Sequence, residues 1–166
     1  MSPIQTILHP TDFSAYSEHA LELAAALARD YQARLIIMHA VEPMAIGFDG
    51  MVVPRSEEEL DALHRKLEEV RPKNRDIAVQ HEFVKDDPVT AILRTIAGEN
   101  CDLVVMGTHG RTGLGRLLMG SVAEQIVRKA ACPVLTVKTP MSRPELKVEA
   151  TGGRQSSMAA GDFSFQ

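Results

Sequence analysis

The residues best suited to chemistry lie in one stretch, GTHGRTGLGRLLMGS, which runs from residue 107 to residue 121. Five of its fifteen residues are glycine, so successive backbone N–H groups are able to turn toward a single anion. A helix-like run follows the stretch, and the free N–H groups at the start of a helix attract the same kind of ligand. The stretch therefore predicts a phosphate site, with Gly107, Gly110 and Gly120 lining it and Arg111 and Arg116 adding charge-assisted hydrogen bonds.

The same stretch also fits a purely structural role. Ser121 and Glu124 have the spacing of a capping box, and Gly120 would then do no more than permit a turn. The usual phosphate-binding motifs are absent from the sequence. No G-x-x-x-x-G-K-[ST] pattern occurs, and His-Pro-Thr-Asp-Phe-Ser follows the first apolar run, where a dinucleotide fold needs G-x-G-x-x-G.

The hydrophobic pattern predicts the elements that position this stretch. Strands are expected at residues 4–9, 34–41, 77–85, 102–106 and 133–138, and helices at residues 18–32, 57–70, 88–97 and 121–131. Ser56 and Asp87 are the expected N-caps of the second and third helices. Residues 43–54 are expected to form a loop, either a plain connector or a lid over a ligand. The alternation predicts an α/β fold, with a doubly wound five-stranded parallel sheet and helices on both faces.

The polarity of the third strand predicts the strand order. Residues 77–85 alternate between polar and apolar, which indicates an edge, whereas the other strands are nearly continuous apolar runs that need cover on both faces. With right-handed connections and one reversal of direction, the order 3-2-1-4-5 follows. Strands 1 and 4 then flank the point of reversal, where ligands bind at the carboxyl ends. Asp12, just after the first strand, is thus expected to face the glycine-rich stretch.

Composition limits the classes of protein that the chain fits. A length of 166 residues predicts one domain. The net charge of −4, the absence of Trp and the 4% aromatic content argue against nucleic-acid binding. No apolar run approaches the roughly 20 residues of a membrane span, and the N-terminus lacks the features of a signal peptide, so we expect a cytoplasmic protein. Cys101 and Cys132 have neither disulfide nor metal spacing and are expected to be small packed residues.

The composition changes after residue 139. Residues 140–166 contain Gly152-Gly153 and four serines and have no helical or strand period. We therefore expect a domain at residues 1–139 and a C-terminal tail, 140–166, without a fold of its own. The alternative is a tail that docks on a partner subunit through Phe163 and Phe165.

The glycine spacing resembles that of a known family. Gly107-x-x-Gly110, followed after nine residues by Gly120-Ser121, matches the G-2x-G-9x-G-[S/T] signature of the ATP-binding branch of the universal stress protein family. Three further segments look like members of this family: residues 7–14, ILHPTDFS, residues 39–42, HAVE, and residues 131–137, ACPVLTV. The resemblance covers about residues 2–139.

The resemblance implies a role for each matching residue. Asp12, beside Pro10 and Thr11 at the end of the first strand, would hold the ribose hydroxyls or the adenine edge, and Val41 and Met106 would lie against the base. Gly107, His109 and Gly110 would line the path of the ribose and phosphates, and Gly120, Ser121 and Val122 would bind phosphates. Arg111 and Arg116 fall inside the spacer, where the signature fixes nothing, so their role rests on charge alone.

Several of these residues have alternative roles. Taken alone, Asp12 also fits the N-cap of the first helix. His9 and His39 lie in strands and are expected to be packed polar residues rather than ligands. His109 is the histidine of the predicted crevice, yet no Asp, Ser or Cys is placed in the sequence to form a catalytic relay with it.

The expected function is that of an ATP-binding regulatory protein of the stress response, with Rossmann-like architecture. ATP, or ADP or AMP, would bind with an accompanying Mg²⁺. A homodimer would form through the strand Pro133 to Lys138, an apolar sheet edge that a two-fold contact would cover. The alternatives are a slow ATPase or adenylate-handling enzyme, and a nucleotide-free dimeric interaction module. At most, weak ATPase activity is expected.

Overall fold

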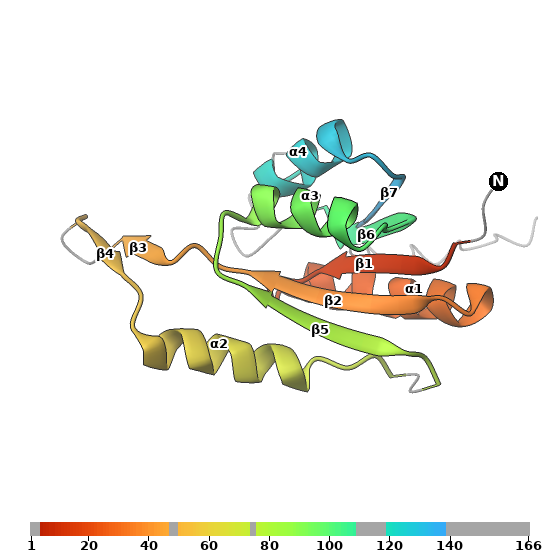
Figure 1. Ribbon diagram of the computed structural model, residues 1–166, viewed down its shortest axis with the longest axis horizontal. Helices are drawn as coiled ribbons and strands as arrows, with labels where there is room; N and C mark the ends of the chain where they lie inside the picture. The colour runs from red at the N-terminus through yellow and green to blue at the C-terminus, as the bar shows by residue number, and fades with distance from the viewer. Residues whose placement is uncertain (1–3, 47–49, 74–75, 109–118, 139–166) are drawn as a thin grey trace, which may run out of the picture.

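Five parallel strands form the central sheet in the order β5-β2-β1-β6-β7 (Figure 1). The computed structural model describes residues 4–46, 50–73, 76–108 and 119–138. Its elements are β1 (Thr6–Pro10), α1 (Ala15–Tyr31), β2 (Arg34–Ala40), β3 (Met44–Ile46), β4 (Val52–Pro54), α2 (Glu57–Glu69), β5 (Val79–Val84), α3 (Pro88–Gly98), β6 (Leu103–Gly107), α4 (Ser121–Lys129) and β7 (Val134–Val137). The order confirms the predicted 3-2-1-4-5 sheet, with the half-buried β5 at one edge.

The helices cover both faces of the sheet, as predicted. α1 and α2 pack on one face, and α3 and α4 pack on the other; in Figure 1, α2 lies at the bottom and α3 and α4 lie at the top. Because neighbouring residues of a strand point to opposite faces, each strand serves two cores. Ile7 of β1 and Leu35 of β2 pack on the α1 side, whereas Leu8 and Ile36 pack on the α3 and α4 side. Within the described part of the chain, no helix combines the length and the apolar character that crossing a membrane requires.

Local signals set the starts of two helices. Ser56 caps α2 in a reciprocal capping box with Glu59. Asp87 caps α3 by accepting a hydrogen bond from the Thr90 N–H at 2.8 Å, with Pro88 at the first helical position. Both caps were predicted from the sequence. The Thr90 hydrogen bonds hold the pKa of the Asp87 carboxyl below its usual value.

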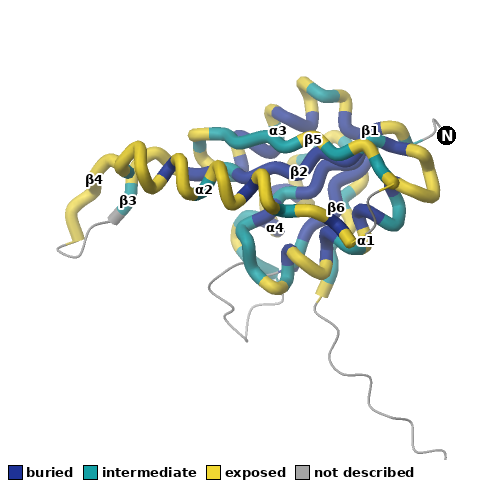
Figure 2. The backbone as a smooth tube through the Cα atoms, turned by 90° about the horizontal axis from the view of Figure 1, so that it is seen from below, coloured by how far each residue is buried: buried dark blue, intermediate teal, exposed yellow. Residues whose placement is uncertain are grey.

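The expected loop at residues 43–54 is instead built around a short hairpin. β3 and β4 pair antiparallel, with Met44 opposite Pro54 and Ile46 opposite Val52, and Gly50 has a φ of 79°, which favours glycine. Strands of three residues are too short to show a clear period in the sequence. The hairpin projects beyond the sheet, and Met51 and Val52 are each 65% exposed (Figure 2).

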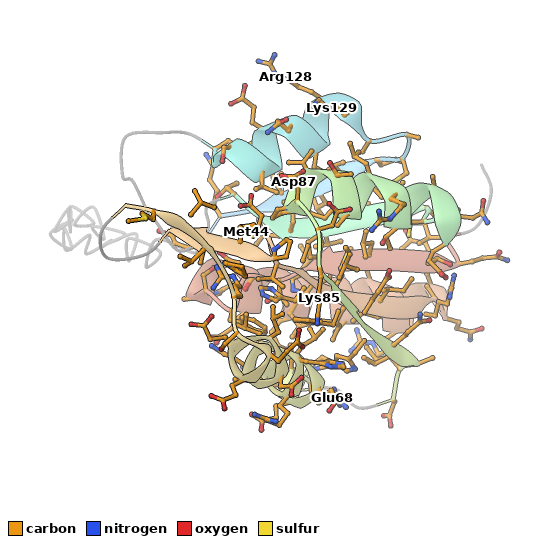
Figure 3. All side chains as sticks on the ribbon, turned by 60° about the vertical axis from the view of Figure 1, so that its left-hand side comes forward. Met44, Glu68, Lys85, Asp87, Arg128 and Lys129 are labelled. Carbon is orange, nitrogen blue, oxygen red and sulfur yellow. The ribbon has the colours of Figure 1, made fainter. Side chains whose placement is uncertain are left out.

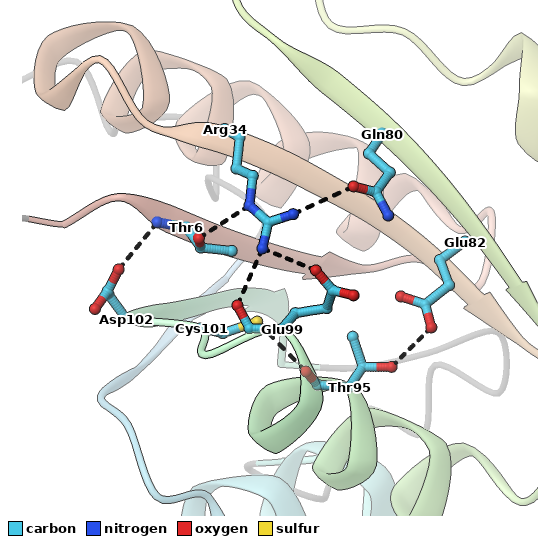
Figure 4. Close-up of polar contacts among 8 residues, drawn as sticks. All are labelled: Thr6, Arg34, Gln80, Glu82, Thr95, Glu99, Cys101 and Asp102. Carbon is cyan, nitrogen blue, oxygen red and sulfur yellow. Dashed lines mark hydrogen bonds and ion pairs between the residues drawn. The ribbon is translucent and has the colours of Figure 1, made fainter.

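The amino ends of the strands are tied together by polar contacts (Figure 4). The Arg34 guanidinium donates to the Thr6 hydroxyl at 3.1 Å and to the Glu99 carboxylate at 2.8 Å. Asp102 accepts hydrogen bonds from the backbone N–H groups of Gln5 and Thr6. These contacts fix β1 against β2 and β6 at the amino edge of the sheet. Ligands of doubly wound sheets bind at the opposite, carboxyl edge.

Candidate functional site

A cavity of about 280 Å³ lies at the carboxyl ends of β1, β2 and β6, on the face covered by α3 and α4. Its lining consists of Pro10, Thr11, Asp12, Ser17, Met38, His39, Ala40, Pro88, Ile92, Met106, Gly107, Thr108, Gly120, Ser121, Val122 and Ala123. In Figure 3 this edge of the sheet is turned toward the viewer, with Met44 of the hairpin and Asp87 before α3 labelled. The cavity occupies the point of reversal between β1 and β6, where the topology predicts a ligand.

Most of the residues predicted for a site meet in this cavity. Eight of the twelve line it: Pro10, Thr11, Asp12, Met106, Gly107, Gly120, Ser121 and Val122. Val41 does not line it; its side chain is buried, and its N–H donates to the Val84 carbonyl at 2.9 Å. His109, Gly110 and Arg111 lie outside the described residues, as does Arg116.

Asp12 projects from a tight turn and is not the cap of α1. Ser14 is the N-cap, since its side chain accepts from the Ser17 N–H. Asp12 Oδ1 instead accepts from the Ser14 N–H at 3.1 Å and from the Ser14 hydroxyl at 2.6 Å. The intervening Phe13 has a φ of 63°, a left-handed conformation that is unusual for a bulky residue. The capping interpretation of Asp12 is therefore wrong, and its carboxylate remains at the cavity.

Phe13 turns its ring to the other side of this turn. The ring lies 4.3 Å from the His39 ring, centroid to centroid, and the Lys66 ammonium stands 4.6 Å from its centroid. These contacts anchor the strained residue against β2 and α2. The result is that consecutive side chains diverge, with Asp12 at the cavity and Phe13 packed among the residues beneath the sheet.

The start of α4 presents uncapped backbone to the cavity. Gly120 is its N-cap and makes no side-chain capping hydrogen bond, and Ser121 is the first helical residue. The alternative interpretation, a capping box of Ser121 and Glu124, is therefore wrong. The Gly120 N–H donates to the Thr108 carbonyl at 2.7 Å, which joins the two ends of the segment between β6 and α4. Among the described residues, no side chain caps the first N–H groups of α4, and such N–H groups bind anions.

Gly107 has a packing role that the sequence did not reveal. A Cβ at this position would lie 3.0 Å from the backbone carbonyl carbon of Tyr16 in α1. The missing side chain therefore lets the end of β6 approach α1 closely. Gly107 also lines the cavity, so one glycine serves both the packing of α1 and the wall of the site.

Apolar side chains form much of the remaining wall. Met106 comes from β6, and Ala40 from β2, while Pro88 and Ile92 come from α3. The contribution of α3 was missed from the sequence. The topology could have revealed it, because a helix that follows a parallel strand begins at the carboxyl edge of the sheet. A flat apolar group of a ligand would pack against these side chains.

His9 and His39 are buried within their strands, as predicted. His39 Nδ1 donates to the Thr11 carbonyl at 2.7 Å and so ties β2 to the residue before Asp12. His39 also lines the cavity, a role that the sequence did not suggest. His9 is fully buried, and its Nδ1 lies 2.8 Å from the Val105 carbonyl. Burial lowers the pKa of His9 to about 4, so this ring is neutral at physiological pH. Within the ranges described, no group of three or more His, Cys, Asp or Glu side chains is arranged to hold a metal ion.

Comparisons with known proteins agree on one family. The sequence model of the universal stress protein family matches residues 3–138, which include every strand and helix described above. A universal stress protein of Thermus aquaticus is 36% identical over 138 residues, which cover 81% of this chain and 98% of that protein. The universal stress protein UspA from Lactobacillus plantarum superposes with a TM-score of 0.65 at 22% identity, covering 82% of this chain and 99% of its own. A universal stress protein in complex with cAMP superposes with a TM-score of 0.62 at 26% identity, covering 84% and 100%.

Proposed function

Because the chain belongs to the universal stress protein family, we propose that it is a regulatory protein that binds an adenine nucleotide, ATP above all, in the cavity at the carboxyl edge of its sheet. One observation carries this proposal: the Asp12 carboxylate and the uncapped start of α4 at Gly120 line the same cavity. A carboxylate accepts hydrogen bonds from hydroxyls, and free helix N–H groups bind phosphate. A nucleotide offers both groups in one molecule.

The lining residues suggest how the nucleotide lies. Asp12 takes the ribose hydroxyls, with Pro10 and Thr11 beside it. The base lies against Met106 and the apolar wall, and the end of β2 at Ala40, followed by Val41, contacts its edge. All of these residues except Val41 line the cavity. Val41 would contact the base from its position next to Ala40.

The phosphates extend toward α4. Gly120, Ser121 and Val122 supply backbone N–H groups and a hydroxyl, and Gly107, His109 and Gly110 line the path to them. Arg111 adds charge, and a Mg²⁺ accompanies the phosphates. Support for a nucleotide as the ligand comes from the related protein in complex with cAMP, whose fold this chain shares.

Nucleotide occupancy is sensed through a homodimer in this proposal. β7 is a sheet edge in the described structure, and Leu135 on it is 38% exposed. An exposed edge strand favours pairing with another chain, and a two-fold contact covers both copies at once. The domain of residues 1–139 then acts in the cytoplasm in a stress response, with residues 140–166 as a tail.

Two measurements on the purified protein test the proposal. The protein is denatured and its supernatant is run on an anion-exchange column, where released ATP or ADP is expected. In parallel, ATP with Mg²⁺ is titrated into nucleotide-free protein, and a ligand at 100 times its dissociation constant stabilises the fold by about 2.7 kcal/mol. Absence of both released nucleotide and a thermal shift contradicts the proposal. Rapid steady-state turnover to ADP or AMP would instead identify an enzyme.

A further inference from the structure

We propose that Ser14 is the positioning residue of the site, because its hydroxyl and N–H hold one oxygen of Asp12 and leave the other for the ligand. The inference rests on the proposed nucleotide function and goes beyond it by assigning the selection of ribose to a residue that does not line the cavity. Ser14 precedes α1, and Asp12 follows β1, so the pair joins the strand to the helix at the site.

The hydrogen bonds define which carboxylate oxygen is available. Oδ1 of Asp12 accepts the Ser14 hydroxyl at 2.6 Å and the Ser14 N–H at 3.1 Å. Among the described residues, no donor reaches Oδ2. An ionised carboxylate accepts hydrogen bonds and donates none, so the ligand group that meets Oδ2 must carry a proton on oxygen or nitrogen. A pair of ribose hydroxyls satisfies this requirement.

Further hydrogen bonds fix the position of Ser14 itself. Its Oγ accepts from the Ser17 N–H at 3.3 Å, and its carbonyl accepts from the Ser17 hydroxyl at 2.8 Å. The Ser17 hydroxyl lies 3.0 Å from that of Thr11, which is buried. Since the Ser17 proton is used on Ser14, Thr11 is the donor of that contact. The start of α1 therefore holds Ser14 in place, and Ser14 in turn holds Asp12.

This arrangement lowers the entropic cost of ordering the Asp12 carboxylate when the ligand binds. A carboxylate free to rotate must be ordered by the ligand, whereas one fixed in advance loses little freedom on binding. The effect is specific for ligands that use Oδ2. Loss of the Ser14 hydroxyl should therefore weaken binding of ribose nucleotides and leave nucleotides without ribose hydroxyls nearly unaffected.

Four proteins and two ligands test the assignment by titration calorimetry. Dissociation constants for ATP and 2′,3′-dideoxy-ATP are measured with the full-length protein and its Ser14→Ala, Ser14→Thr and Ser56→Ala variants. Wild type should prefer ATP by roughly tenfold, the worth of one hydrogen bond to a charged group. In Ser14→Ala this ratio should shrink toward one, and in Ser14→Thr, which keeps the hydroxyl, it should recover.

Ser56→Ala controls for helix stability. Ser56 caps α2 as Ser14 caps α1, and it does not line the cavity, so its loss should lower stability without changing the ratio. An unchanged ratio in a folded Ser14→Ala variant overturns the positioning role. Equal affinity of wild type for both ligands overturns the contact between Asp12 and ribose, and the inference with it. Failure of wild type to bind ATP at all refutes the proposed function first.

Discussion

The backbone of Tyr16 occupies the space that a side chain at residue 107 would need. Its carbonyl carbon, and its Cβ, lie 3.0 Å from the position of a Cβ built on Gly107, a contact so tight that Tyr16 would have to shift by a few tenths of an ångström. Tyr16 lies in the first turn of α1, directly after Ser14 and Ala15. The glycine thus sets the distance between the end of β6 and the turn that carries Asp12.

Gly107→Ala should therefore destabilise the fold. Backbone atoms at Tyr16 have no rotamer with which to give way, and overpacking of this kind costs about 1–3 kcal/mol. The free energy of unfolding, measured by urea denaturation, checks the change. Gly98→Ala is the matched control, because a Cβ at Gly98 meets nothing within 4 Å and alanine favours a helix. Equal stability of the two variants would contradict the close approach at Tyr16.

Gly120→Val should abolish nucleotide binding while leaving the fold intact. Gly120 lines the cavity at the start of α4, and its φ of −71° is one that valine adopts without strain. The added side chain would occupy the space proposed for the phosphates, and a loss of at least about 100-fold in affinity is expected, equivalent to roughly 2.7 kcal/mol. Calorimetry with ATP measures it, and circular dichroism checks the fold. Unchanged affinity would move the phosphate site away from α4.

Stability should fall between pH 6.5 and pH 4 because of His9. Burial lowers the pKa of the folded-state ring from 6.5 to about 4, so in this window the unfolded chain binds a proton that the folded chain does not. The stabilisation is fully present above pH 6.5 and is lost as the pH falls toward 4. The loss amounts to roughly 3 kcal/mol if His9 alone is counted.

Urea denaturation at several pH values, repeated with His9→Gln, measures this contribution. The variant should lose less stability than wild type over the same window. His19→Gln on the exposed surface of α1 serves as the control and should keep the wild-type slope. If the His9 variant and wild type lose stability equally between pH 6.5 and pH 4, the burial of His9 does not cause the pH dependence of stability.

Leu135→Glu should convert a homodimer into monomers. Leu135 is 38% exposed on the edge strand β7, and a carboxylate there would have to be desolvated and would face its own copy across a two-fold contact. Sedimentation velocity determines the mass. Leu23→Glu on α1, at a position 37% exposed, is the matched control and should leave the mass unchanged. A wild-type monomer, or a Leu135→Glu dimer, would exclude pairing through β7.

The sequence predicted the fold well because hydrophobic spacing alone decides most of it. The alternating polarity of residues 77–85 placed β5 at the edge, and the order of the other strands followed from the handedness of the connections. Capping was predictable where one candidate stood before the helix, as at Ser56 and Asp87. It failed before α1, where Asp12 and Ser14 compete and only the turn at Phe13 decides between them.

The site was harder to predict than the fold. The meeting of Asp12 with Gly120 followed from topology, but the reason for glycine at residue 107 did not. That reason is a contact with Tyr16, far away in the sequence, and no local pattern encodes it. The hairpin of β3 and β4 was missed because strands of three residues are too short to show a period. The contribution of Ile92 to the cavity was missed because it depends on which elements lie beside the carboxyl edge.

The two cysteines make the protein convenient for site-directed labelling. Burial raises the pKa of the Cys101 thiol to about 12, and it raises that of Cys132 as well, so the reactive thiolate is scarce at both positions near neutral pH. They are the chain's entire complement of cysteine. A fluorophore on a cysteine introduced at the exposed Met51 would therefore attach ahead of the native thiols. Such a probe would report, in real time and without deleting either cysteine, whether the projecting hairpin moves when a nucleotide arrives.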